Sequence, residues 1–236
     1  MTTGHSKTAD DGDLSLTTMS ADLLNLLAAA FPVGLPDLFL VGHSMGGPVV
    51  VHAAGQKTLR VQGVCVVDVV EGTALEAVTG IGMLSYLRGR PAMFRSVAEA
   101  VSWSLSSGTV RNDESAAVSI PPQLTLRDPD NLLLGYTWRT DLFATQPFWL
   151  DWYNDLSNRF LSVRGARLLI LAGPDRLDKP LMIGQMQGKF QLKMLPAAGH
   201  TVQEDQPGGV AAILIDFVNR NAVLDVAAIR KRTMGA

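Results

Sequence analysis

The stretch VGHSMGG, residues 41–47, decides the fold of this chain. It contains the pattern G-x-S-x-G, with a glycine two residues before and two residues after Ser44. The apolar run Asp37–Val41 before it has the length of a buried strand, and Pro48–Ala54 after it is typical of a helix that begins with proline. A serine on such a tight turn is exposed at the end of a sheet, and the glycines make room for the turn. The stretch therefore predicts a nucleophilic serine, with a phosphate-binding loop or a plain turn as the alternative.

The rest of the chain continues the alternation of strand and helix. Three further apolar runs have the length of buried strands: Val61–Val67, Arg167–Ala172 and Lys189–Leu195. Helices are predicted from Thr17 or Thr18 to Ala30, and over Pro207–Asn219. Strands that are apolar throughout and separated by helices indicate a mostly parallel sheet covered on both faces, which is an α/β fold. We expect a single domain over residues 1–236, with residues 74–160 inserted as a helical cap over one end of the sheet.

Composition excludes several classes of protein. Of the 236 residues 47% are hydrophobic and 18% are charged, whereas a disordered chain combines low hydrophobicity with high charge. A single cysteine allows neither a disulfide framework nor a Cys-rich zinc site. A net charge of −2 gives no basic field for nucleic acid, and no apolar run has the length of a membrane span. The acidic N-terminal segment does not resemble a signal peptide, so we expect a cytoplasmic protein with no metal site.

A serine nucleophile needs a base, and the chain has four histidines. His200 lies in a loop after the last predicted strand, which agrees with the chain order serine, acid, histidine of this fold. His5 lies in the N-terminal tail, and His52 lies in the helix after the serine. The side chain of His43 is expected on the other side of its strand. His200 is therefore the predicted base, and a structural loop histidine is the alternative.

The acid that orients the histidine has more than one candidate. Asp68 follows the second predicted strand and Asp175 follows the third, so both lie at carboxyl ends of strands, where such sites are assembled. Asp178 is a third choice. These positions alone do not choose among the three aspartates. The backbone N–H of Met45, at the start of the next helix, is expected to stabilise an oxyanion.

Other reactive or bulky residues allow two interpretations each. Cys65 lies among valines in a strand, which favours a buried, inert thiol over a nucleophile. An aromatic group could line a pocket or simply pack the cap: Tyr136, Trp138, Phe148, Trp149, Trp152 and Tyr153. Four arginines could anchor a carboxylate-bearing substrate or remain solvated: Arg88, Arg90, Arg95 and Arg139.

Six segments between about Gly4 and Asn219 carry a resemblance to a known family. They are VGHSMGG at 41–47, VDVVEGTA at 67–74, LRGRP at 87–91, YTWR at 136–139, LAGPDRLD at 171–178 and GQMQGKF at 184–190. In these segments the chain resembles the protein phosphatase methylesterase 1 family, whose members have the α/β-hydrolase fold. Several of the segments are specific to that family rather than general to hydrolases.

The resemblance implies an activity and a site. The family removes the methyl ester from the C-terminal leucine of the protein phosphatase 2A catalytic subunit, its partner, without a cofactor, and the location implied is the cytoplasm and also the nucleus. The family's acid is the aspartate of the DVVEGTA segment, which implies a triad of Ser44, Asp68 and His200 and makes Asp175 a structural residue. The resemblance further suggests that substrate contacts are made by Arg88, Tyr136, Trp138 and Arg139.

Two departures from the family modify these expectations. The acidic insertion that some members carry in the cap is absent from residues 115–135. Members also have a longer segment before the position of Gly4, which holds the first strands and the loop that donates the second oxyanion N–H. We therefore expect residues 37–41 to form an edge strand and the esterase activity to be impaired, because loss of one oxyanion donor costs about 10²–10³ in rate. The alternative is an inactive module that binds the phosphatase; a general small-molecule esterase is disfavoured by the family-specific segments.

Overall fold

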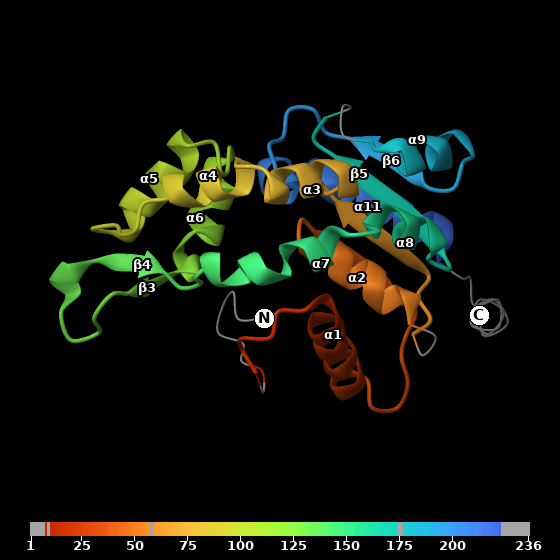
Figure 1. The fold of residues 1–236 in the computed structure, drawn as a ribbon, viewed down its shortest axis with the longest axis horizontal. Coiled ribbons are helices and arrows are strands. Elements are labelled where there is room, and N and C mark those ends of the chain that lie inside the picture. Colours follow the sequence, from red (N-terminus) through yellow and green to blue (C-terminus); the bar gives the residue numbers. More distant parts are fainter. Residues whose placement is uncertain (1–7, 9, 57–58, 174–176, 223–236) are drawn as a thin grey trace, which may run out of the picture.

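The computed structural model describes residue 8 and residues 10–56, 59–173 and 177–222. Its main sheet has four parallel strands in the order β1-β2-β5-β6 (Figure 1). They are β1 (Phe39–His43), β2 (Gly63–Val67), β5 (Ala166–Leu171) and β6 (Gln191–Met194). All four predicted strands are present, with their ends shifted by no more than about two residues. Strand β1 lies at one edge of this sheet, as expected.

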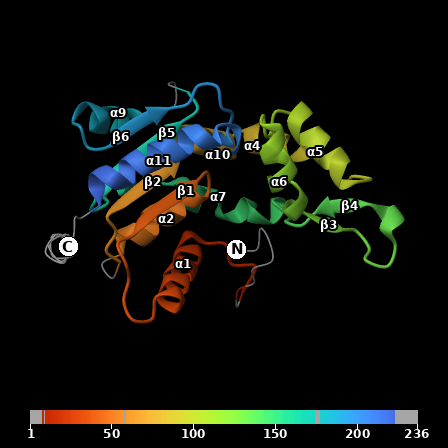
Figure 2. The same ribbon diagram turned by 180° about the vertical axis from the view of Figure 1, so that it is seen from behind.

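Alternate residues of the central strands face two separate cores. Val64 and Val66 of β2 pack in the larger core, to which several helices contribute side chains, among them α1 (Leu16–Ala30), α2 (Gly46–Gly55) and α8 (Leu156–Ser162). Cys65 and Val67 face the opposite side and pack against α10 (Val202–Asp205) and α11 (Pro207–Asn221), which Figure 2 shows in front of the sheet. Burial on both faces explains why the strand sequences are apolar throughout.

Helix α1 begins earlier than predicted. Ser15 is its N-cap, because the Ser15 side chain accepts a hydrogen bond from the backbone N–H of Thr18. The hydroxyl of Thr18 donates to Asp13 instead of capping the helix. The N-cap was ambiguous in the sequence because serine and threonine are both preferred at this position.

The chain between β2 and β5 forms helices and one hairpin. The helices are α3 (Glu71–Thr79), α4 (Gly82–Gly89), α5 (Val97–Ser106), α6 (Asp113–Ser119), α7 (Trp149–Tyr153) and α8, with short 3₁₀ turns at Pro121–Gln123, Leu132–Leu134 and Phe143–Phe148. The hairpin, not predicted from the sequence, pairs β3 (Leu124–Leu126) with β4 (Tyr136–Trp138). The part with α5, α6 and the hairpin extends away from the sheet and contains a third core, formed by Phe94, Ala100, Val110, Ala116, Ile120 and Leu124 (Figures 1 and 2).

The remaining helix, α9 (Lys179–Met186), follows β5 and lies beside β6 (Figure 1). Within the described ranges, no helix combines the length and the apolar character needed to span a membrane.

Candidate active site

The turn between β1 and α2 holds Ser44 in an unusual backbone conformation. Ser44 has φ of 51°, in the left-handed region that non-glycine residues rarely occupy. Its N–H donates to the carbonyl of Val67 on β2 at 3.0 Å, which fixes the turn at the end of the sheet. Such strain is maintained at sites where it positions a functional group.

The glycines around Ser44 have different roles. A Cβ on Gly42 would lie 2.2 Å from the carbonyl oxygen of Gly46, and a Cβ on Gly47 would lie 2.6 Å from Cγ1 of Val69. A Cβ on Gly46 would meet nothing within 4 Å. The expectation that both flanking glycines make room is therefore right for Gly42 and wrong for Gly46. Close packing of α2 on β2 requires Gly47 instead.

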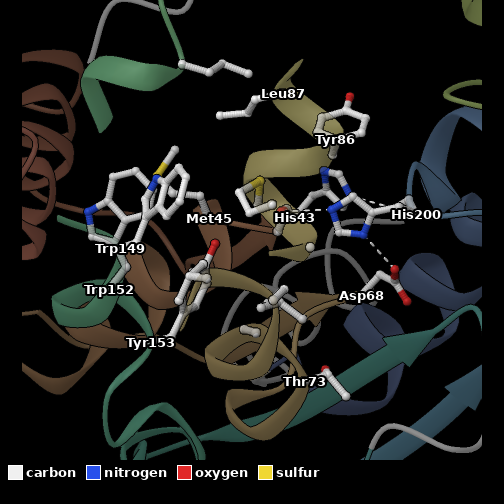
Figure 3. A pocket seen from close by; sticks show the side chains of 18 of the residues that line it. His43, Met45, Asp68, Thr73, Tyr86, Leu87, Trp149, Trp152, Tyr153 and His200 are labelled. Carbon is white, nitrogen blue, oxygen red and sulfur yellow. Dashed lines mark hydrogen bonds and ion pairs between the residues drawn. The ribbon is translucent and has the colours of Figure 1, made fainter. Parts of the chain in front are cut away.

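Ser44, His200 and Asp68 form one chain of hydrogen bonds, of which Figure 3 shows the part between His200 and Asp68. Nδ1 of His200 lies 2.8 Å from Oδ2 of Asp68, and Nε2 of His200 lies 2.9 Å from Oγ of Ser44. Because a carboxylate only accepts, Nδ1 carries the proton and Nε2 is left to accept the serine hydroxyl. This arrangement leaves the imidazole ready to remove the proton of Ser44.

Asp68 is held in place by the neighbouring strand. It directly follows β2 with φ of 52°, and its side chain is fully buried. Its N–H donates to Ile170 of β5 at 2.8 Å, and its Oδ1 accepts the N–H of Ala172 at 3.0 Å. Backbone contacts to β5 and to the residue that follows it therefore orient the carboxylate that faces His200.

Asp178, another of the acid candidates, is not brought to His200. Asp178 is the N-cap of α9, where Oδ1 accepts the N–H of Leu181 at 3.1 Å and Oδ2 accepts the hydroxyl of Ser157 at 2.6 Å. Asp175 lies outside the described residues, as does His5.

The sequence suggested that the side chain of His43 points away from the serine, and this prediction is wrong. Its Nε2 lies 2.7 Å from the carbonyl oxygen of His200, and the two imidazole rings are 4.8 Å apart between centroids. Since a carbonyl only accepts, Nε2 of His43 carries the proton and donates it. Burial, with a further contribution from the charge of His200, lowers the pKa of His43 and keeps the ring neutral. The strained turn explains the error, because regular strand alternation ends before Ser44.

Asp205, which sequence reasoning missed, holds the other side of the His200 loop. Its carboxylate accepts the N–H of Gly199 at 2.6 Å and the N–H of Arg111 at 2.7 Å. The backbone is thus fixed on both sides of His200, by Asp205 before it and by His43 after it. The only sequence signal was an aspartate soon after the histidine, which is too common to indicate this role.

A cavity of about 870 Å³ opens beside the serine. Its floor is apolar, with side chains such as Val70, Ala74, Val78, Met83 and Leu87, and Met45 also lines it. The aromatic residues of α7 form one side, with His200 and Asp68 on the other (Figure 3). No lysine, arginine or glutamate is among the described side chains that line it.

The aromatic group identified in the sequence divides between pocket and packing. Trp149, Trp152 and Tyr153 line the cavity, and burial raises the pKa of Tyr153 to about 12. The indole N–H of Trp149 donates to Thr145 at 2.7 Å, and that of Trp152 donates to the carbonyl of Leu14 at 2.7 Å. These bonds leave the ring faces to form an apolar wall.

The four side chains expected to contact substrate do not line this cavity. Arg88 is exposed on α4. Tyr136 and Trp138 pack against the third core, and the guanidinium of Arg139 donates to the carbonyls of Pro122 and Leu124. The structure therefore places these residues apart from Ser44.

Two further points concern the chemistry of the site. Cys65 is buried in β2, as predicted, and burial raises the pKa of its thiol to about 12. Among the described side chains, no cluster of three histidines, cysteines or acidic residues could hold a metal ion.

Solved structures support the fold. A hydrolase of E-2-(acetamidomethylene)succinate superposes with a TM-score of 0.71 at 18% identity, covering 92% of this chain and 78% of that chain. An esterase of M. tuberculosis superposes with a TM-score of 0.65 at 21% identity, covering 92% of this chain and 73% of that chain. At these identities the likeness concerns the arrangement of strands and helices.

Sequence comparison adds the family. The chain is 49% identical over 216 residues to the protein phosphatase methylesterase 1 of Aspergillus fumigatus, covering 89% of this chain and 51% of the relative. It is 42% identical over 224 residues to the protein of the same name from Schizosaccharomyces pombe, covering 94% of this chain and 64% of the relative. The chain thus spans about half to two thirds of the length of these relatives, and the resemblance seen in the sequence is confirmed. A family model described as the alpha/beta hydrolase family matches residues 2–213, and the chain belongs to that family.

Proposed function

We propose that this chain is a protein phosphatase methylesterase, which removes the methyl ester from the C-terminal leucine of the protein phosphatase 2A catalytic subunit. The names of the relatives support the substrate, and the alpha/beta hydrolase family supports the reaction class. The observation that carries the proposal is the hydrogen-bond chain from Ser44 through His200 to the buried Asp68.

In the first half of the reaction, Oγ of Ser44 attacks the ester carbonyl while Nε2 of His200 accepts the hydroxyl proton. The carbonyl oxygen becomes an oxyanion, which the N–H of Met45 at the start of α2 stabilises. The bond to the methoxy oxygen then breaks, and His200 returns its proton to that oxygen. Methanol leaves, and the peptide remains as an ester on Ser44.

In the second half, water attacks the acyl-serine and His200 accepts one of its protons. Collapse of this intermediate breaks the bond to Ser44, which regains its proton from His200, and the free carboxylate is released. Asp68 stabilises the imidazolium in both halves through the 2.8 Å contact to Nδ1. No metal or organic cofactor takes part in any of these steps.

The cavity is suited to this substrate. Its apolar floor and aromatic side complement a leucine side chain and a methyl group, and burial of such groups provides binding energy. In this proposal residues 1–236 act as one domain, and residues 74–160 form the cap over the site. The phosphatase is the partner in this proposal, and the proposed location is the cytoplasm and also the nucleus.

Labelling with a fluorophosphonate serine probe tests the assembled triad. We expect the parent chain to be labelled and the Ser44→Ala and Asp68→Asn variants to remain unlabelled. Methanol release from a methylated phosphatase then tests the substrate. Binding to the phosphatase without labelling would instead support an inactive docking module.

A further inference from the structure

Arg90 has an unusual position just after α4. Its guanidinium carbon lies 3.9 Å from the centroid of the Trp138 ring, so the planar cation stacks over the indole. The indole N–H of the same tryptophan donates to the carbonyl of Pro91 at 2.8 Å. Trp138 therefore holds both the backbone at Pro91 and the guanidinium of Arg90.

The platform beneath Arg90 is itself rigid. The Trp138 ring packs against Phe94 at 5.3 Å and against Trp103 at 5.7 Å between centroids. The hydroxyl of Thr137 donates to the carbonyl of Ala92 at 3.1 Å, which ties the arginine segment to the hairpin. A cation held this way loses little further side-chain entropy when it binds a ligand.

The charge of Arg90 has no anionic partner in the described part of the chain. No described side chain or carbonyl accepts from its guanidinium, and the titratable side chain that acts on its pKa is the phenol of Tyr86 rather than a carboxylate. Other arginines do have partners, as Arg95 with Glu99 at 3.6 Å shows. Stacking occupies the face of the guanidinium and leaves the in-plane N–H groups at its edge for a ligand. Burial lowers the pKa of Arg90, which is the cost of holding a cation there.

The position of Arg90 relates it to the proposed active site. Tyr86 and Leu87, one turn earlier on α4, both line the cavity beside Ser44 (Figure 3). A peptide that enters the cavity with its C-terminal ester can leave it past Tyr86 toward Arg90. Residues upstream of the ester would then pass the segment that carries Arg90.

We propose that Arg90 is a specificity-determining residue that binds a carboxylate side chain of an acidic peptide segment upstream of the ester. The planar fork of the guanidinium matches a carboxylate with two parallel hydrogen bonds. This inference rests on the proposed methylesterase function. Arg88, two residues earlier in the last turn of α4 and exposed, provides a matched control of equal charge.

The first test measures binding, which needs no turnover. The Ser44→Ala variant is titrated with two fluorescein-labelled peptides that end in leucine methyl ester. One peptide carries glutamates upstream of the ester, and the other carries glutamines at the same positions. We expect the acidic peptide to bind about tenfold more tightly, the typical value of one hydrogen bond to a charged group. Three further substitutions are each combined with Ser44→Ala. Arg90→Met should remove the preference for the acidic peptide, Arg90→Lys should keep part of it, and Arg88→Met should leave it unchanged.

The second test measures hydrolysis of the same two peptides by the chain with Ser44 intact. Arg90→Met should raise KM for the acidic peptide about tenfold, with kcat and the neutral peptide unaffected. Equal losses on both peptides, or equal binding of both by the parent, would overturn the proposal and leave Arg90 as a packing residue. Selective binding without any hydrolysis would sustain the role of Arg90 and refute the methylesterase function.

Discussion

Two regions of the molecule differ in how they are built. The sheet region consists of β1, β2, β5 and β6 with the helices that cover them, and it holds Ser44, Asp68 and His200. The outer cap region, residues 90–139, has its own core and carries the guanidinium of Arg90 on an aromatic platform. The catalytic residues and the proposed recognition residue are therefore supported by separate cores. This difference teaches that rate and specificity can be altered separately.

The two regions meet at the His200 loop. The hydroxyl of Thr201 donates to the carbonyl of Thr109 at 2.8 Å, and that of Ser119 donates to Glu204 at 2.5 Å. Asp205 completes the contact through the N–H of Arg111. A few hydrogen bonds thus connect the base of the triad to the outer cap region, and the predictions below test this division.

The largest effect is expected in the sheet region, from Asp68→Asn. An amide in place of the carboxylate favours the wrong tautomer of His200, and the labelling rate should fall about 10⁴-fold with little change in stability. The measurement is the second-order rate of fluorophosphonate labelling. A loss of less than tenfold would mean that Asp68 does not orient the base.

Ile120→Ala tests whether the outer cap region unfolds separately. Ile120 is 1% exposed in the third core, and its truncation should cost about 3 kcal/mol. We expect amide hydrogen exchange to accelerate in α5, α6 and the hairpin, while the amides of β2 and β5 keep their protection. Equal acceleration in both regions would show that they form one cooperative unit. Leu169→Ala, in the sheet core, is the matched control.

Asp205→Asn tests the connection between the regions. In the variant, an amide nitrogen faces the N–H of either Gly199 or Arg111, so one of the two hydrogen bonds is lost. His200 is then displaced, and kcat should fall about 10²-fold with KM nearly constant. Asp216→Asn, on the surface of α11 and paired with Arg220, should leave kcat unchanged. A loss of stability with kcat unchanged would instead assign Asp205 a purely structural role.

The smallest effect concerns pH and His43. Its pKa is lowered in the folded state, so near and below pH 6.5 the unfolded chain binds more protons, and stability falls as the pH falls. His43→Gln places a non-titrating amide N–H near Nε2 and should flatten this part of the curve. Urea unfolding at pH 7.5 and pH 5.5 measures the difference. An unchanged pH slope in the variant would assign the effect to other groups.

The sheet was predictable because its strands are apolar on both faces, as in β5, and because the turn around Ser44 has a specific pattern. The hairpin was not, since each of its strands has three residues and depends on the distant bridge between Phe94 and Tyr136. Position in the sequence did not distinguish Asp68 from Asp175 as the acid of the triad, since both follow strands. The contacts of His43 and Asp205 to the His200 loop arise from tertiary packing, which local sequence does not encode.

The burial of Cys65 has a practical consequence. The chain has one cysteine, and a thiol with a pKa of about 12 inside β2 does not react with maleimide dyes at neutral pH. An Arg88→Cys chain would therefore carry a single dye on the outer surface of α4. Fluorescence from that site would report, in real time, a change in the surroundings of α4 when a peptide or the phosphatase binds.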